Sequence, residues 1–292
     1  MSRLCQDRVV VVTGAGRGIG RAHALGFAAE GALVVVNDVD EGVTAEVVAE
    51  IEALGGKAVA DTSDVADWAG AKELIGTAVA HFGRLDVLVN NAGFLRDRML
   101  VNLGEDEWDA VIRVHLKGHF APLRHAAEHW RAEAKAGRTP GARVINTSSG
   151  AGLLGSVGQG NYSAAKAGIA GLTVVAAAEL ARYGVTVNAI APAARTRMTE
   201  AVFASMARPD TGFDAMAPEN VSPLVVWLGS EESAHVTGRV FEVEGGKVSL
   251  AQAWRHGPAV DKGQRWDPAE LGPVVKELLE RAPEPEPVYG AS

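Results

Sequence analysis

The first turn of this 292-residue chain, TGAGRGIG at residues 13–20, decides its fold. It follows the apolar run 9–13, which is typical of a buried strand, and it precedes a helical pattern that ends near residue 30, before Gly31. Glycines let a backbone turn tightly and approach a pyrophosphate, whose charge the free N–H groups at a helix start then meet. The place of the cluster between strand and helix is what dinucleotide binding requires. The residues of this expected cofactor turn are Gly14, Arg17, Gly18, Ile19 and Gly20.

Short β-branched runs and helical stretches alternate along the rest of the chain, which is typical of a parallel sheet covered on both faces. Strands are predicted at 9–13, 32–37, 57–61, 85–90, 142–147, 185–190 and 238–243. Helices are predicted up to residue 30 and at 44–54, 67–82, 105–133 (with Pro122 as a kink or boundary) and 162–183. We expect an α/β fold: a single Rossmann-like, doubly wound domain with a seven-stranded parallel sheet over residues 1–250.

The last part of the chain differs in composition from this domain. Residues 251–292 are expected to form a C-terminal extension of irregular structure. Its end, APEPEPVYGAS, alternates prolines with acids, and we expect about the last ten residues to be mobile.

Composition restricts the class of protein. The 28 Lys and Arg against 36 Asp and Glu leave a net charge of −8, which disfavours nucleic acid as a partner. The single cysteine, Cys5, allows neither an intrachain disulfide nor a thiol-rich metal site, and we expect no metal. The sequence shows no signal segment and no uninterrupted apolar run of 18 residues, so we expect no membrane contact and a cytoplasmic protein.

A carboxylate, Asp38, follows the second predicted strand. Such a group accepts hydrogen bonds from both adenosine ribose hydroxyls and repels a 2′-phosphate, which favours NAD over NADP. Arg17 argues the other way, since a guanidinium can hold a phosphate. We weigh Asp38 more heavily, because a buried clash of like charges costs more than a solvated arginine gains.

Two further strand ends are predicted to meet the same crevice. Asp64-Val65 follows the third strand, where a carboxylate can bond the adenine amino group. Asn91-Ala92-Gly93 follows the fourth strand, where a turn of small residues can pass under the cofactor. Each pair or triplet alone is ordinary turn chemistry, but their order along the chain favours a site.

Tyr162 and Lys166 are four residues apart at a helix start, so they share one face. A nearby ammonium, helped by the positive charge of an oxidised nicotinamide, stabilises a phenolate and lowers the pKa of the tyrosine. The phenol can then exchange a proton with a carbinol oxygen while a hydride is transferred. Ser149 ends the fifth strand, and its hydroxyl can hold the same oxygen. We expect these three residues to be catalytic.

The ordered set TGAGRGIG, NNAG (90–93), Ser149 and YSAAK (162–166) resembles the short-chain dehydrogenase/reductase family over residues 5–247. The resemblance implies an oxidoreductase in which Ser149, Tyr162 and Lys166 are catalytic. It implies cofactor contacts for Gly14, Gly18, Gly20, Asp38, Asp64 and Asn91, and it places Thr196 near the nicotinamide amide. There are two departures: His115 stands where the family usually has an asparagine, and Pro192-Ala193 replaces a usual Pro-Gly.

His115 has two interpretations. An imidazole can hydrogen-bond a backbone group and a water as an amide does, which keeps a proton-relay role and predicts activity that falls in acid. It can equally be a satisfied core histidine.

Within the family, RVHLKG (113–118), NAGFLRDR (91–98) and GQGNYSAAK (158–166) are similar to the (3R)-hydroxyacyl-CoA dehydrogenase part of peroxisomal multifunctional enzyme type 2. This likeness implies oxidation of 3-hydroxyacyl-CoA to 3-ketoacyl-CoA with NAD, in a stand-alone version. The alternatives are a hydroxysteroid or other secondary-alcohol dehydrogenase and, in another class, a non-catalytic dinucleotide sensor. A 3-oxoacyl carrier-protein reductase is disfavoured by Asp38.

The substrate is expected to meet a loop at 198–218. Its apolar anchors are Phe203, Met206, Phe213 and Met216, and Arg96, Arg98 and Lys117 are candidates for a CoA phosphate. Alanine-rich outer helix faces, for example 176–178, allow close packing between subunits, and we expect a homo-oligomer, a tetramer or a dimer.

Overall fold

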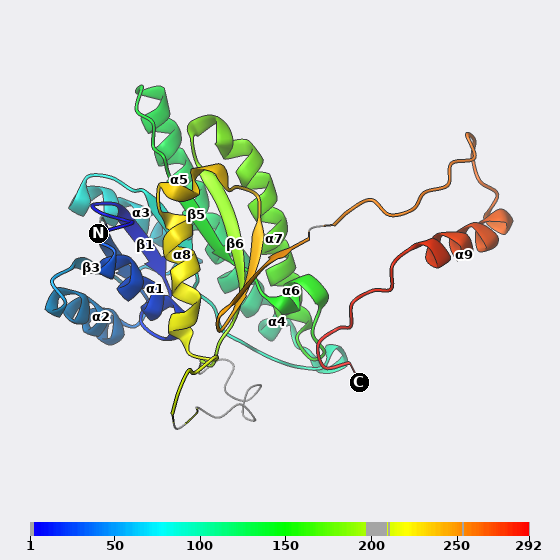
Figure 1. Cartoon of the computed structure of the whole chain (residues 1–292), viewed down its shortest axis with the longest axis horizontal. Coiled ribbons are helices and arrows are strands. Elements are labelled where there is room, and N and C mark those ends of the chain that lie inside the picture. Colours follow the sequence, from blue (N-terminus) through cyan, green and yellow to red (C-terminus); the bar gives the residue numbers. More distant parts are fainter. Residues whose placement is uncertain (1–2, 197–208, 210, 253, 292) are drawn as a thin grey trace.

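One eight-stranded sheet forms the centre of the protein in the computed structural model, which describes residues 3–196, 209, 211–252 and 254–291 (Figure 1). The strand order is β3-β2-β1-β4-β5-β6-β7-β8. The strands are β1 (Val9–Thr13), β2 (Leu33–Asn37), β3 (Lys57–Asp61), β4 (Val87–Asn90), β5 (Arg143–Thr147), β6 (Thr186–Ala193), β7 (Val240–Glu244) and β8 (Lys247–Ala251). The α-helices are α1 (Gly18–Ala29), α2 (Glu41–Ala53), α3 (Trp68–Phe82), α4 (Glu105–Ile112), α5 (Gly118–Lys135), α6 (Gly150–Leu154), α7 (Gly160–Leu180), α8 (Ser222–Gly229) and α9 (Leu271–Arg281).

The predicted Rossmann-like architecture is confirmed, but the strand count was one too low. The first seven strands pair in parallel, whereas β8 pairs antiparallel with β7, with Val240 opposite Ala251. A Gly245-Gly246 turn joins them, with Gly245 at φ +52°. Such a two-glycine turn is a hairpin signal, and the sequence interpretation assigned no strand between residue 243 and the extension that it began at residue 251.

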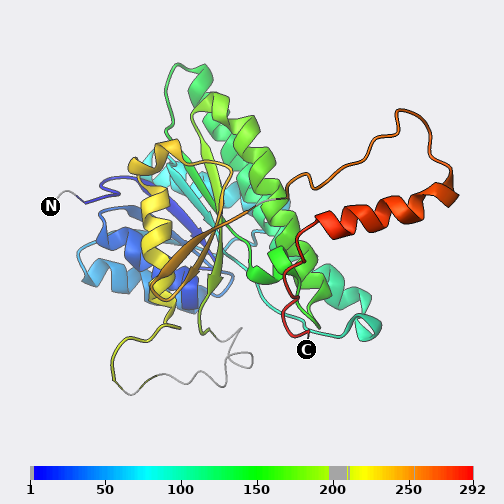
Figure 2. The same ribbon diagram turned by 45° about the vertical axis from the view of Figure 1, so that its right-hand side comes forward.

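Alternate residues of the central strands point to opposite layers. Val10 and Val12 pack with α1, α2 and α8, whereas Val9 and Val11 pack with α3, α5 and α7. The helices on the two faces are seen in Figures 1 and 2. Each such side chain contributes roughly 1.5–3 kcal/mol when fully buried. Because helices cover both faces of the sheet, a ligand can bind only at the carboxyl ends of the strands. The strand order reverses there between β1 and β4.

The expected long helix at 105–133 is interrupted earlier than predicted. The break is a π-helical turn, η2 (Arg113–Lys117), between α4 and α5, whereas Pro122 lies inside α5. A π-turn inserts one extra residue and rotates the side chains that follow, and such turns are frequent at functional sites. Here it carries His115, which is buried.

Within the described part of the chain, one helical stretch, Gly160–Tyr183, is long and apolar enough to cross a membrane by length and composition. It is α7 with the turn that follows it. Ile169, Thr173 and Ala177 on this helix are buried. Packing against the sheet accounts for these buried residues, whereas Val174 and Val175 on the same helix are exposed.

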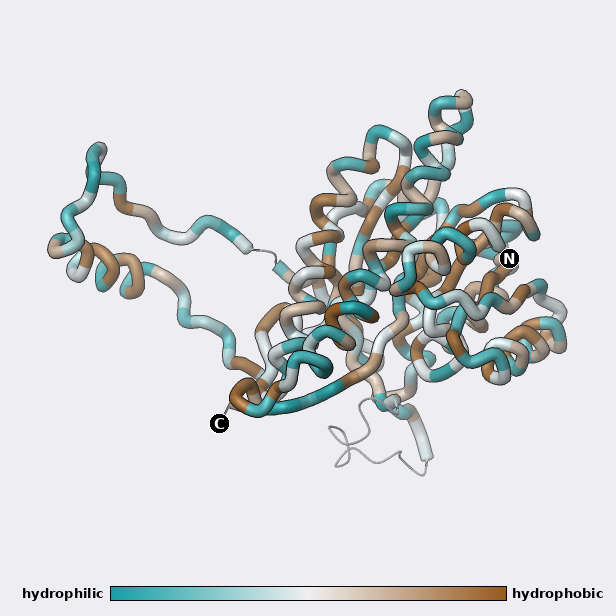
Figure 3. The backbone as a smooth tube through the Cα atoms, turned by 180° about the vertical axis from the view of Figure 1, so that it is seen from behind, coloured by the Kyte–Doolittle hydropathy of each residue, from teal (hydrophilic) through white to brown (hydrophobic). Residues whose placement is uncertain are grey.

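The C-terminal extension leaves the body after β8 and comes back to it. Figures 1 and 2 show α9 standing away from the sheet, and the last residues returning beside α6. The return is held by two backbone hydrogen bonds, from Val157 N to Tyr289 O (2.9 Å) and from Tyr289 N to Gly155 O (3.2 Å). The tube in Figure 3 shows that α9 carries hydrophobic residues although it is set apart from the body; Leu271, Val275 and Leu279 are exposed.

Candidate active site

The glycine turn after β1 is shaped so that side chains cannot replace its glycines. Gly14 has φ +60° and Gly18 has φ +53°. A β-carbon at Gly20 would lie 2.1 Å from the Gly14 carbonyl oxygen. Among the described residues no side chain caps the start of α1, and its first turn contains no acid. The first N–H groups of α1 are thus left for an anion, as pyrophosphate binding needs.

Asn91 braces this turn from β4. Its Nδ2 donates to the carbonyl oxygens of Thr13 (3.0 Å) and Gly14 (3.2 Å), and its backbone N–H donates to Thr13 Oγ1 (2.9 Å). A β-carbon at Gly14 would lie 2.8 Å from Ala92 Cα, so the two turns pack directly against each other. The predicted cofactor residues at the ends of β1 and β4 are therefore brought together.

Asp38 and Arg17 lie on the same side of the turn but have different partners. Asp38 Oδ2 accepts from Gly16 N at 3.3 Å. Arg17 is paired with Asp40 at 2.8 Å, and this hydrogen bond holds the pKa of the Asp40 carboxyl below its usual value. Since Asp40 already neutralises Arg17, the arginine is less suited to a 2′-phosphate.

Asp64 is more strongly engaged within the protein than the sequence suggested. Its Oδ2 forms an ion pair with Arg113 at 2.6 Å, and its Oδ1 accepts from Ala66 N at 2.8 Å. Val65 beside it is buried. Thr196 lies at the glycine turn, since a β-carbon at Gly18 would be 3.4 Å from its Cγ2. Asp64 thus holds η2 to the end of β3, and its role toward adenine stays a prediction.

Ser149 and Tyr162 meet at the carboxyl edge of the sheet. Ser149 caps α6 by accepting from Ala151 N at 3.2 Å, and Tyr162 is in the first turn of α7. Burial raises the pKa of Tyr162 above its usual value, a hydrogen bond with Ser149 lowers it, and the Asp97 charge raises it. In the chain without cofactor the pKa of Tyr162 is therefore raised and not lowered as expected, and the group that lowers it is Ser149 rather than Lys166.

Lys166 lies behind Tyr162. Its Nζ is 5.5 Å from the centroid of the tyrosine ring and donates to the Thr147 carbonyl oxygen at 2.6 Å. The side chain is buried, and burial lowers the pKa of Lys166 to about 7. The three predicted catalytic residues are thus assembled, from the end of β5 and the start of α7.

His115 is part of this cluster, and of its two interpretations burial agrees with a core histidine and not with titration near neutrality. Its ring makes an edge contact with Tyr162 (centroids 5.1 Å apart), and its Nε2 lies 2.7 Å from Phe94 O. Burial and the Lys166 charge lower the pKa of His115 to about 3. A β-carbon at Gly93 would be 2.1 Å from His115 Cε1. Gly93 therefore makes room for a neutral imidazole.

Sequence reasoning missed an exposed apolar segment at the start of α7. Met99, Leu100 and Val101, hereafter the apolar lip, are 55%, 75% and 90% exposed. A β-carbon at Gly160 would be 3.6 Å from Leu100 Cδ1, so the lip contacts the start of α7.

Two other residues, Asn161 and Tyr289, were also missed. Buried Asn161 ties α7 to the segment before the lip, since its Nδ2 donates to Arg96 O at 3.0 Å. Tyr289 contacts Gly150, next to Ser149: a β-carbon at Gly150 would be 2.7 Å from its hydroxyl. The adjacent apolar run 99–101 was the available signal for the lip; nothing in the sequence foretold the return of residue 289.

The expected substrate loop is described only in part. Phe203 and Met206 lie outside the described residues, Phe213 is exposed, and Met216 is buried. Of the basic candidates for a CoA phosphate, Arg98 is paired with Glu107 at 3.2 Å, Arg96 lies over the Phe94 ring, and Lys117 is exposed.

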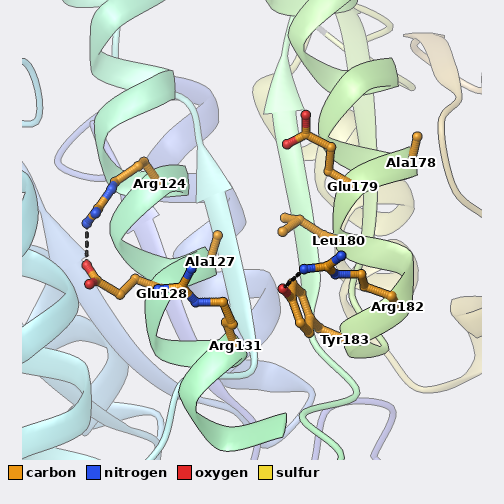
Figure 4. Close-up of a pocket in the computed structure, with 9 residues that line it drawn as sticks. All are labelled: Arg124, Ala127, Glu128, Arg131, Ala178, Glu179, Leu180, Arg182 and Tyr183. Carbon is orange, nitrogen blue, oxygen red and sulfur yellow. Dashed lines mark hydrogen bonds and ion pairs between the residues drawn. The ribbon is translucent and has the colours of Figure 1, made fainter. Parts of the chain in front are cut away.

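A hollow of about 450 Å³ lies elsewhere, between the outer faces of α5 and α7 (Figure 4). Arg124, Glu128 and Arg131 line it from α5, and Glu179 and Leu180 from α7. Glu179 is 17 residues beyond Tyr162 on one helix, which corresponds to about 25 Å. This hollow is therefore remote from the catalytic cluster.

A glycine turn with free helix N–H groups, facing a Ser–Tyr–Lys cluster, defines a dinucleotide-binding oxidoreductase. The model of the short chain dehydrogenase family matches residues 8–207. The chain is 47% identical over 285 residues to hydroxyacyl-CoA dehydrogenase ChsB1 of Mycobacterium tuberculosis, which covers 93% of this chain and 88% of that protein. It is 46% identical over 250 residues to peroxisomal multifunctional enzyme type 2 of Mus musculus, covering 82% of this chain and 32% of that longer enzyme.

A solved structure is also similar, that of a short chain dehydrogenase from Mycobacterium avium. It is 66% identical in sequence and has a TM-score of 0.92. The match covers 99% of this chain and 100% of that one. The chain therefore belongs to the short-chain dehydrogenase family, and it is an oxidoreductase that acts on CH–OH groups.

Proposed function

We propose that this chain is an NAD-dependent 3-hydroxyacyl-CoA dehydrogenase of lipid or steroid side-chain breakdown. The observation that carries the substrate class is the apolar lip, Met99–Val101, which contacts Gly160, two residues before Tyr162. A contiguous exposed apolar segment of this kind marks a ligand or partner site, and an acyl chain has the matching chemistry. The names of the Mycobacterium tuberculosis and mouse relatives support the same class.

The residues of the cluster have distinct roles in this proposal. The Tyr162 phenolate takes the hydroxyl proton of the substrate, and Ser149 holds the same oxygen by a hydrogen bond. Lys166, as the ammonium, favours the phenolate form of Tyr162. NAD, when bound, supplies the acceptor for the hydride that leaves the carbinol carbon. The alcohol thus loses a hydride and a proton and becomes the ketone.

NAD is proposed over NADP because Asp38 lies at the glycine turn and Arg17 is already paired with Asp40. Asp38→Ser is expected to improve kcat/KM with NADP relative to NAD by about tenfold or more, since a repelling charge is removed. Asp7→Ser, a change at an exposed carboxylate, is the control. An unchanged cofactor preference in Asp38→Ser would sink the NAD assignment.

The substrate class is tested by cofactor reduction, followed by absorbance, with NAD and a panel of (3R)-hydroxyacyl-CoAs, steroid alcohols and simple secondary alcohols. Hydroxyacyl-CoA is expected to have the highest kcat/KM. Leu100→Ser is expected to raise KM about fivefold or more for a long acyl chain, because apolar contact is lost, and to leave a short chain unaffected. Leu54→Ser, at a distant exposed leucine, is the control. Equal effects on both chain lengths would contradict the role of the lip.

The second candidate is a hydroxysteroid dehydrogenase, since the same apolar lip suits a fused-ring alcohol. The panel separates the two: a free steroid alcohol turned over faster than every acyl-CoA would select it. A dinucleotide sensor, the other alternative, is not compatible with the family assignment as an oxidoreductase.

We also propose a homo-oligomer and a cytoplasmic location, as the sequence predicts. Support for self-association comes from α9, whose Leu271, Val275 and Leu279 remain exposed in one chain.

A further inference from the structure

A second buried histidine, His119, lies behind the catalytic cluster and has no part in the mechanism above. It is the second residue of α5, directly after the π-turn, and its side chain is fully buried. Its Nε2 accepts from the Thr147 backbone N–H at 3.4 Å. The proton of a neutral ring is then on Nδ1, and backbone groups of His115 and Asn90 lie within reach of the ring.

Thr147 connects His119 to Lys166. It is the last residue of β5, and its carbonyl oxygen accepts from Lys166 Nζ at 2.6 Å. The backbone of one residue is therefore bound on its N–H side by α5 and on its carbonyl side by α7. The other side of His119 is also fixed, because Asn90 Nδ2 donates to its carbonyl oxygen at 3.3 Å.

We propose that His119 is a positioning residue for Lys166: its neutral imidazole holds the end of β5 in the place from which the Thr147 carbonyl fixes the ammonium behind Tyr162. This rests on the proposed roles of Tyr162 and Lys166. Burial and the charges of Lys166 and His115 hold the pKa of His119 well below its usual value, which keeps Nε2 an acceptor. The titratable groups facing it are Lys166 from α7 and His115 from η2; Asn90 and Thr147 do not titrate.

The test compares His119→Leu with His119→Gln. Gln places an amide oxygen near the position of Nε2, whereas Leu has no acceptor. We expect Leu to lower kcat about tenfold or more, to change KM and the NAD dissociation constant less than about twofold, and to move the acid limb of the kcat–pH profile to higher pH. That direction follows because a displaced ammonium stabilises the Tyr162 phenolate less. Gln is expected to restore kcat and the profile.

His125→Leu is the matched control on the same helix, since His125 Nε2 lies 3.1 Å from the Trp68 carbonyl oxygen and its Nδ1 lies 3.3 Å from Arg124 Nη1, away from the cluster. Should His119→Leu fail to fold, His119→Asn replaces it, because its amide is too short to reach the Thr147 N–H. Wild-type kcat and pH profile in Leu or Asn, or equal losses in Gln and Leu, would overturn the proposal. Full activity of Tyr162→Phe would instead refute the proposed function itself, whatever the His119 variants do.

Discussion

The two halves of the site, the glycine turn at residues 13–20 and the polar cluster around Tyr162, are held in place by different interactions. The turn depends on backbone contacts so close that a single β-carbon at Gly20 would meet a carbonyl oxygen at 2.1 Å. The cluster depends on buried polar side chains, Lys166, His115 and His119, whose pKa values are all lowered mainly by burial. The glycine turn fixes the position of the backbone at little electrostatic cost. The cluster instead retains buried polar side chains that destabilise the fold but serve the reaction.

The largest effect is expected at Lys166. Lys166→Met should lower kcat about a thousandfold, because the phenolate of Tyr162 loses its ammonium. Lys57→Met, at an exposed lysine, is the control and should have wild-type kcat.

The same variant should be more stable than the wild type. The pKa of Lys166 is about 7 when folded against 10.5 as its ordinary value, so between these pH values the unfolded chain binds the extra proton. The burial penalty is therefore complete below pH 7 and disappears toward pH 10.5. Without cofactor, we expect Lys166→Met to gain about 3 kcal/mol in free energy of unfolding at pH 6. A gain that is equal at pH 6 and pH 10 would contradict this account of the cluster.

A substitution in the glycine turn is expected to weaken the binding of NAD. Gly20→Ala places a β-carbon against Gly14 O and Asn91 Nδ2, so we expect the NAD dissociation constant to rise about tenfold or more. Gly76→Ala is the matched helical control, because no described atom lies within 4 Å of its added β-carbon. Calorimetric titration of both variants with NAD makes the comparison. Equal affinities would mean that the turn can relax.

A double-mutant cycle tests the contact between the cluster and the turn after β4, which packs on the glycine turn. Gly93→Ala alone should destabilise the protein by about 2 kcal/mol, since the new methyl group meets the His115 ring. In the background of His115→Ala the space is vacant, and the cost should fall below about 0.5 kcal/mol. Urea unfolding of the four proteins measures this coupling. If the changes in free energy of unfolding of the two single variants add up to that of the double variant, the contact is contradicted.

The smallest effect is expected from His115→Asn on pH dependence. With a pKa of about 3, His115 stays neutral in the working range, so the kcat–pH profile between pH 5 and 9 should not change. A lost acid limb in the variant would show that His115 titrates in that range after all.

The sequence predicted the glycine turn better than the catalytic cluster, because the turn depends on local backbone contacts and the cluster depends on burial. Where backbones approach closely, only glycine fits, so the spacing of glycines is visible in the sequence. Alternating strands and helices are visible in the same way, and β1 and β3 were predicted to the residue. The burial of His115 and His119 depends on the π-turn at Arg113–Lys117, which no local pattern announced. The two interpretations of His115 stayed open at the level of the sequence for that reason, because burial could not be judged from residue type. β8 was missed because it is an exposed edge strand after a short turn.

The central claim is that Tyr162 moves the proton in this oxidoreductase, and the most direct test is Tyr162→Phe with a (3R)-hydroxyacyl-CoA and NAD. This change removes only the hydroxyl group that bonds Ser149. We predict that kcat falls about a thousandfold while the NAD dissociation constant stays within about twofold of the wild type. Turnover at the wild-type rate with NAD still bound would contradict the account.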